Sequence, residues 1–155
     1  MSVIGNLATE IFSDEFDSDT GVVASGSIEA WLENNLGQLN NLIYQDFSGD
    51  SASLDTEAQS IHKELYLYNY YTKQSRNALR GITAATNDNK ILSLKDGEST
   101  VTFVNRNEVS KVYRGLANDS KDKLGDLVAR YNIYEAVPQQ VGGIDGEIFT
   151  GSVNT

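Results

Sequence analysis

Three long stretches of the chain repeat apolar residues every three or four positions, the spacing of a helix that buries one face. They cover residues 27–47, 53–82 and 105–132, and residues 3–12 repeat the pattern over a shorter length. Because an isolated helix is marginal in water, such stripes predict helices that pack on one another. We therefore expect a mainly α fold: a helical bundle of three main helices plus a short N-terminal helix, with residues 13–26 as a loop.

Polar residues that favour helix N-termini stand at the start of each main stretch. Ser27 is the expected N-cap of the first, and Ser53 or Asp55 that of the second. Asn105 and Glu108 have the spacing of a capping box at the start of the third. These residues predict where the three helices begin.

One β-hairpin is predicted at about residues 90–104. Two alternating apolar runs there flank Asp96 and Gly97, a pair that favours a two-residue type I′ turn. That turn would pair Leu92 with Val101. Because a two-stranded hairpin is marginal alone, we expect it to lie on the helices or to join strands of a neighbour.

The last part of the chain differs from the rest in composition and lacks the helical apolar spacing. Residues 1–135 are expected to form a single helical domain with the hairpin inserted, and residues 136–155 an extended C-terminal tail or arm containing the chain's only proline and four glycines. A flexible tail is one interpretation. The tail's apolar residues favour another, a segment that adds to a partner. Those residues are Val141, Ile144, Ile148 and Phe149.

The second helix is rich in tyrosine. Tyr66 and Tyr70 fall to one side of the stripe that contains Leu65 and Tyr68. An outward pair of tyrosines suits a protein–protein contact, because the ring is apolar and the hydroxyl is polar. The alternative is a broad core face in a packing of three helices. The sequence leaves both open.

Charge is distributed unevenly along the chain, whose net charge is −10. Residues 1–62 contain 11 acidic and no basic residues, whereas residues 63–155 contain 12 basic and 11 acidic residues. An acidic segment repels phosphate, which argues against tight wrapping by nucleic acid. It is compatible with a solvated face, with a surface that meets the basic patch of a neighbouring subunit, or with a channel through which DNA slides.

Several kinds of chemistry are excluded or disfavoured. The chain has no cysteine and one histidine, His62, which excludes disulfides, thiolate sites and multi-histidine metal sites. We expect His62 to be a surface or interface residue.

Asp17 and Asp19 match a short phosphotransferase pattern, but no apolar strand precedes them. A calcium-binding loop that starts at Asp17 would need an acidic residue at the position of Ile28. We expect no enzyme activity, no catalytic residues, no cofactor and no metal.

Neither a signal peptide nor a membrane span is predicted. The start, MSVIGNLATEIF, has neither a basic segment nor a long apolar core, so no signal peptide is expected. No apolar run approaches the roughly 20 residues of a membrane span. We expect a soluble protein that is made in a cytoplasm.

Three strings carry a resemblance to a known family. They are IEAWLENNLGQLNNLIYQDF, EAQSIHKELYLYNYYTKQSRNAL and KDGESTVTFVNRNEVSKVYRGLANDSKDKLGDLVARYN. With them, about residues 27–141 resemble the small head-to-tail connector proteins (adaptor or head-completion proteins) of tailed bacteriophages. The resemblance implies a subunit of a twelve-fold ring beneath the portal protein, with a helical body and a hairpin and C-terminal arm that reach neighbours. It implies residence in the virion, contacts with portal and with tail or neck proteins, and passage of genomic DNA through the lumen without sequence-specific binding.

The leading hypothesis is thus a virion structural protein, a ring subunit of the phage neck that bridges portal and tail. One alternative is another virion component, such as a tail terminator, neck or decoration protein. A second is an acidic regulatory or inhibitory binding module, which the acidic N-terminal segment favours. The candidate protein-interface residues are Tyr66, Tyr70, Val141, Ile144, Ile148 and Phe149.

Overall fold

The computed structural model describes residues 2–48, 54–84, 93–97, 99–102 and 106–135. The described part is mainly α, as the apolar spacing predicts, and none of its helices is long and apolar enough to cross a membrane. Its elements are, in chain order, α1 (Val3–Phe16), α2 (Ser25–Asn34), α3 (Leu36–Ile43), α4 (Thr56–Ala84), β1 (Ser93–Asp96), β2 (Ser99–Thr102) and α5 (Arg106–Glu135).

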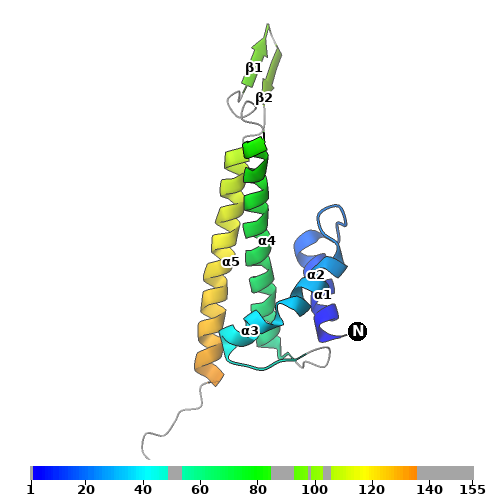
Figure 1. Cartoon of the computed structure of the whole chain (residues 1–155), viewed down its shortest axis with the longest axis vertical. Helices are drawn as coiled ribbons and strands as arrows, with labels where there is room; N and C mark the ends of the chain where they lie inside the picture. Colours follow the sequence, from blue (N-terminus) through cyan, green and yellow to red (C-terminus); the bar gives the residue numbers. More distant parts are fainter. Residues whose placement is uncertain (1, 49–53, 85–92, 98, 103–105, 136–155) are drawn as a thin grey trace, which may run out of the picture.

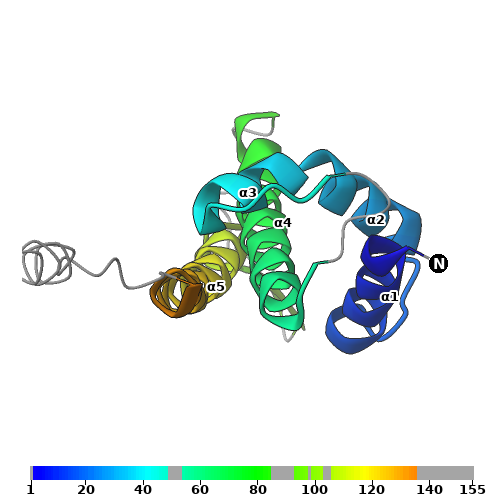
Figure 2. The same ribbon diagram turned by 90° about the horizontal axis from the view of Figure 1, so that it is seen from below.

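The two longest helices form an antiparallel pair that the other helices cover over part of its length. Figure 1 shows α4 and α5 side by side, with the β-hairpin at one end of the pair. Helices α1 to α3 gather around the other half, and α1 and α2 lie on the side of α4 that faces away from α5 (Figures 1 and 2). We call residues 2–48 the helical base, and residues 73–84 of α4 with residues 106–118 of α5 the stalk.

The apolar core lies where the helical base meets α4. Each apolar stripe of α1, α2 and α3 is buried against its neighbours, and the burial of these side chains is the main favourable term for folding. The most deeply buried apolar side chains are Ile11, Ile28, Leu32, Leu39, Ile43 and Ile61.

Helix α1 is longer than the sequence predicts. The hydroxyl of Ser2 caps it by accepting from the amide of Gly5 at 3.0 Å, and the helix continues through Phe16 into what was expected to be a loop. Phe16 lies one turn after Phe12 and is buried, so its packing outweighs the weak helix propensity of the polar residues between them. The helix ends at Asp17, whose φ of 49° is left-handed.

The single helix predicted over residues 27–47 is wrong, because the chain breaks at Asn35 into α2 and α3. The side-chain amide and the backbone N–H of Asn35 both donate to the Trp31 carbonyl, at 2.8 and 3.0 Å. An asparagine side chain that competes for a backbone carbonyl in this way offers the chain an alternative to a continuous helix. The predicted cap Ser27 lies inside α2, which begins after Ala24 without a side-chain cap.

The prediction of Asp55 as the cap of α4 is confirmed. One carboxylate oxygen of Asp55 accepts from the amide of Ala58 at 2.7 Å, and the other accepts from the Tyr131 hydroxyl at 2.9 Å. The alternative cap, Ser53, lies outside the described residues. Asp55 therefore begins α4 and also joins it to the end of α5.

Helix α5 continues to Glu135, slightly beyond its expected end near Asn132. The side-chain amide of Asn132 donates to the Leu42 carbonyl at 3.1 Å, which holds the last turn against α3. The capping box predicted at Asn105 lies outside the described residues.

The strands β1 and β2 are antiparallel and lie within the predicted hairpin, but the predicted register is wrong. Val101 pairs with Leu94 and not with Leu92. Asp96 is the last paired residue of β1, so the turn begins at Gly97, whose φ is +59°. A left-handed conformation costs glycine little, which favours a turn that begins with Gly97 over one that begins with Asp96.

Candidate protein-interaction surfaces

Of the predicted interface residues, Tyr66 is not accessible. It is 5% exposed, and its ring packs edge-on against Phe16 and Trp31 with centroids 6.4 and 5.3 Å away. The expectation of an outward Tyr66 is therefore wrong, and the alternative of a broad core face holds for it. The reason is that α4 is covered on two sides, by α5 and by the end of α1 with α2, so that more of its circumference is buried than one stripe.

Tyr70 is half-buried. Its ring lies 4.9 Å from that of Phe16 and 5.5 Å from that of Tyr71, and it borders an open cleft. The four predicted interface residues of the C-terminal tail lie outside the described residues: Val141, Ile144, Ile148 and Phe149.

The cleft beside Tyr70 is a groove of about 400 Å³ between α2, α4 and the loop that joins α1 to α2. We call it the aromatic cleft, because Trp31, Tyr66 and Tyr70 contribute to its wall. Among the described residues that line it, Lys73 is the only charged one. The described residues that line it are Thr20, Val22, Val23, Ala24, Ser27, Trp31, Tyr66, Asn69, Tyr70, Lys73 and Gln74.

The loop on one side of the aromatic cleft has a defined conformation. The Asp19 carboxylate accepts from the Gly21 amide at 2.8 Å, and the Asp19 amide donates to the Phe16 carbonyl at 2.7 Å. Burial raises the pKa of Tyr66 to about 12 and also raises that of Tyr70, so both phenols keep their protons at neutral pH. The aromatic cleft therefore has neutral, amphipathic walls and one cation at its edge.

The two ends of the molecule differ in charge. The helical base contains eight acidic and no basic residues: Glu10, Asp14, Glu15, Asp17, Asp19, Glu29, Glu33 and Asp46. The stalk contains one acidic residue, Glu108, and six basic ones: Lys73, Arg76, Arg80, Arg106, Lys111 and Arg114. The charge therefore differs along the length of the molecule, with an acidic base and a basic stalk.

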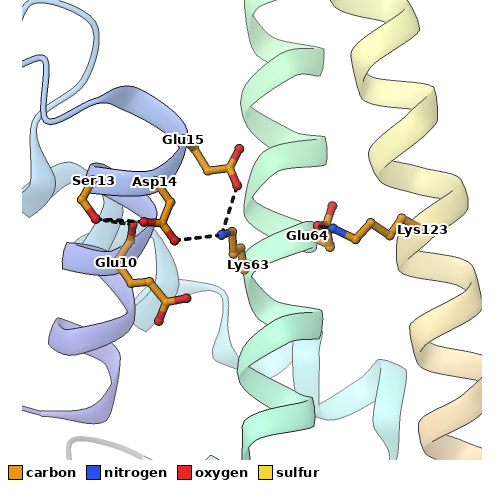
Figure 3. Close-up of polar contacts among 7 residues, drawn as sticks. All are labelled: Glu10, Ser13, Asp14, Glu15, Lys63, Glu64 and Lys123. Atoms are coloured by element: carbon orange, nitrogen blue, oxygen red, sulfur yellow. Dashed lines mark hydrogen bonds and ion pairs between the residues drawn. The ribbon is translucent and has the colours of Figure 1, made fainter.

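Lys63, the first basic residue of the chain, binds the helical base to α4. Its ammonium lies 3.0 Å from Glu15 and 3.7 Å from Asp14 of α1 (Figure 3). Burial alone lowers the pKa of Lys63, but the hydrogen bond to Glu15 and the charges of Glu15, Asp14 and Glu10 outweigh it and raise the pKa. These contacts neutralise only part of the acidity of α1, since Asp14 and Glu15 share one cation.

Polar contacts join α4 to α5 along their length. Glu64, which is 4% exposed, accepts from the Lys123 ammonium (Figure 3). In the stalk, the hydroxyls of Ser75 and Ser110 are 3.0 Å apart, and each also donates to the carbonyl of the other residue at 3.2 Å. No described stalk residue belongs to the main apolar cluster, and the buried residues Ser75, Ser110 and Ala117 lie in this part of the pair.

The outer face of α5 carries exposed apolar side chains, of which Val112 and Leu116 belong to the stripe predicted to be buried. Val112 is 63% exposed and Leu116 is 39% exposed in the stalk, and Ile133 and Tyr134 are exposed at the other end of α5. The prediction of one buried stripe is wrong for Val112 and Leu116, because α4 alone packs against α5 at this height. Single exposed apolar residues are common, but a row along one helix favours a contact with a partner.

His62 is not at the surface, contrary to the sequence-based expectation. It is fully buried beside Trp31, and its Nε2 lies 2.9 Å from the Leu32 carbonyl oxygen. A carbonyl can only accept, so Nε2 carries the proton, while Nδ1 has no hydrogen-bond partner among the described residues. Burial lowers the pKa of His62 despite the opposing effect of the bond to Leu32. The position of His62 in the apolar stripe beside Ile61 is compatible with burial, but no feature of the sequence marks it.

We expect the protein to become less stable as the pH falls below about 6.5, the ordinary pKa of histidine. In that range the unfolded chain binds a proton at His62 and the folded chain does not, which lowers the free energy of unfolding by at most about 1.4 kcal/mol per pH unit. Urea unfolding at a series of pH values between about 7.5 and 5.5 measures this slope. His62→Gln keeps an amide donor for Leu32 and cannot titrate, so its slope should be flatter. Equal slopes in the two proteins would contradict the prediction.

Comparisons with protein-family models, curated proteins and solved structures find no match for this chain. Within the residues that the structure describes, no group of three or more histidine, aspartate or glutamate side chains is placed to hold a metal ion. The surfaces described above are therefore the features from which a function is inferred.

Proposed function

We propose that this chain is a non-enzymatic structural protein of a bacteriophage virion, a subunit of a ring in the neck that bridges portal and tail. The observation that carries the proposal is the charge polarity of one subunit, with an acidic helical base at one end and a basic stalk at the other. That the assembly is a ring in the neck is inferred from the resemblance of residues 27–141 to head-to-tail connector proteins.

A ring of identical subunits needs two different complementary faces on each one. Contacts of this head-to-tail kind close into a ring if the rotation between subunits allows it. Opposite charges on the base and the stalk favour such a contact and disfavour base-to-base or stalk-to-stalk pairing. The exposed Val112 and Leu116 add apolar area on the stalk, which a neighbouring subunit would cover.

The portal and the tail or neck proteins would bind the ring surfaces that neighbouring subunits leave free, and genomic DNA would pass through the lumen. Such a role requires no catalytic group and no cofactor. It requires a rigid body, which the α4–α5 pair offers, and surfaces that differ from one end of the subunit to the other.

Negative-stain electron microscopy of the full-length protein, with particles classified by rotational symmetry, tests the proposal. We expect rings with a central hole at low salt. In sedimentation-velocity runs the assembled fraction should fall as salt rises, because the Debye length shortens from about 10 Å at 0.1 M to about 3 Å at 1 M. Monomers at all concentrations and salts would contradict a ring held by contacts between base and stalk.

A second candidate, an acidic regulatory or inhibitory module, is favoured by the eight acidic and no basic residues of the helical base. It predicts salt-sensitive binding to a basic partner protein and no self-assembly. A virion component without a DNA channel, such as a decoration protein, would be favoured by assemblies without a hole. The same micrographs therefore distinguish the three.

A further inference from the structure

We propose that the aromatic cleft binds the C-terminal segment of a second copy of this chain, with Phe149 against its aromatic wall and Glu147 near Lys73. This inference deepens the proposed function, since its choice of a neighbouring copy over the chain's own tail rests on the ring. It names a further contact between subunits, made by the C-terminal segment, in addition to the contact between base and stalk.

The chemistry of the aromatic cleft defines the kind of ligand that fits it. Trp31 and Tyr70 are only partly buried, so each presents ring surface to the groove. Aromatic rings pair well edge-to-face, and Phe16 already meets Tyr70 in that way from the other side, at 70° and 4.9 Å. With Lys73 as the one charged residue of the described lining, the cleft suits an aromatic residue that has a carboxylate beside it.

The C-terminal segment has this chemistry. Residues 136–155 contain two charged residues, Asp145 and Glu147, and both are acidic. Ile148 and Phe149 follow Glu147 directly. Glu147 and Phe149 are separated by one residue, so in an extended chain they point to the same side. One side chain can then meet Lys73 while the other lies on the aromatic wall.

The length of the tail allows it to reach beyond its own subunit. Helix α5 ends at Glu135, and α5 and α2 lie on opposite sides of α4 (Figure 2). The 14 residues from 136 to Phe149 span up to about 45 Å when extended. A strand of this length can cross to the aromatic cleft of a neighbour in the proposed ring.

Trp31 is the only tryptophan of the chain and lines the aromatic cleft, so its fluorescence reports on binding there. The experiment uses the full-length protein and its full-length Phe149→Ala variant, each over a range of protein concentrations. Val153→Ala is the matched control, because it shortens an apolar side chain of the same tail that lies beyond Glu147 and Phe149. Binding of Phe149 excludes water from Trp31, so we expect the wild type to emit at shorter wavelength as its concentration rises. Phe149→Ala should lack this change, and Val153→Ala should keep it.

An add-back titration gives the affinity of the same contact. A synthetic peptide of residues 141–155, added to the full-length Phe149→Ala variant at low concentration, should move Trp31 emission to shorter wavelength in a saturable way. The same peptide with Phe149→Ala should bind about tenfold more weakly or worse. Lys73→Glu in the protein should weaken the binding of the wild-type peptide, and Glu147→Lys in the peptide should restore part of the lost affinity.

The outcomes separate this inference from the proposed ring. The inference would be overturned, and the proposed ring left intact, if the micrographs show rings but Trp31 emission responds neither to the tail of the full-length protein nor to the added peptide. A wavelength shift that is independent of protein concentration would place the chain's own tail in the cleft and overturn the assignment to a second copy. Saturable peptide binding without any rings would support the cleft assignment and contradict the proposed function.

Discussion

Reversing two charges of the stalk, with Arg76→Glu and Arg114→Glu together, should weaken self-assembly by about two orders of magnitude or more. Both side chains are exposed, one on each helix of the pair, so the variant should fold normally. In the proposed ring the variant stalk would present four basic and three acidic residues to the acidic base of the next subunit, so most of the electrostatic attraction would be lost. Sedimentation velocity at low salt measures the loss.

The matched control reverses two other exposed cations of α5. Lys121 and Arg130 lie on the helix but outside the stalk. The double variant Lys121→Glu and Arg130→Glu changes the net charge by the same amount, so a general effect of net charge would appear in both proteins. Similar losses in the two double variants would contradict a specific role of the stalk.

A complementary variant makes the test sharper. Glu33→Lys and Asp46→Lys reverse two exposed charges of the helical base. This variant should also assemble more weakly alone, because its base keeps six acidic residues and gains two cations that face the basic stalk of the next copy. An equimolar mixture with the stalk variant should form heterodimers, since the unaltered base of the stalk variant then meets the unaltered stalk of the base variant. Failure of the mixture would argue against contacts between base and stalk.

The second large effect concerns stability. Leu39 of α3 is 0% exposed in the core between the helical base and α4. Leu39→Ala should lower the free energy of unfolding by about 2–5 kcal/mol, because it removes buried apolar area and leaves a cavity. Urea unfolding followed by circular dichroism measures the loss, at a protein concentration low enough that assembly does not add to stability.

Leu116→Ala provides the control with the same chemical change. Leu116 is 39% exposed in the stalk, so its truncation should cost less than about 1 kcal/mol. The comparison tests whether stability is concentrated where the helical base covers α4. Equal losses at Leu39 and Leu116 would show that the stalk contributes as much apolar packing as the base, contrary to the burial seen here.

Local features of the fold could be predicted from the sequence. The long helices follow from apolar residues at intervals of three and four, because the helical repeat is a property of the backbone. Asp55 was identifiable as a cap because a cap acts on amides only two or three residues away. The break at Asn35 was missed, since asparagine occurs inside helices as well, and whether its amide takes a backbone carbonyl depends on what packs around it.

The candidate surfaces could be predicted only in part. The segregation of charge is visible in the sequence. The basic residues of the stalk gather at one place only when α4 and α5 pair, because they come from both helices. Tyr66 shows the limit of a face prediction, because its spacing assigns it to a side of α4 and the packing of Phe16 and Trp31 decides that this side is covered. The aromatic cleft combines a loop, α2 and α4, and no local pattern brings these three together.

The sequence by itself therefore determined the helical class, the cap at Asp55 and the charge of each segment, because these depend on residues that are near one another along the chain. The tertiary structure alone decided which side of each helix is buried. It placed His62 and Tyr66 inside, where the sequence predicts exposed positions, and left Val112 and Leu116 outside, where the apolar spacing predicts buried ones. The physical reason is that burial depends on how many neighbours cover a helix at a given height. For α4 beside the helical base that cover comes from two sides, and for α5 in the stalk it comes from one.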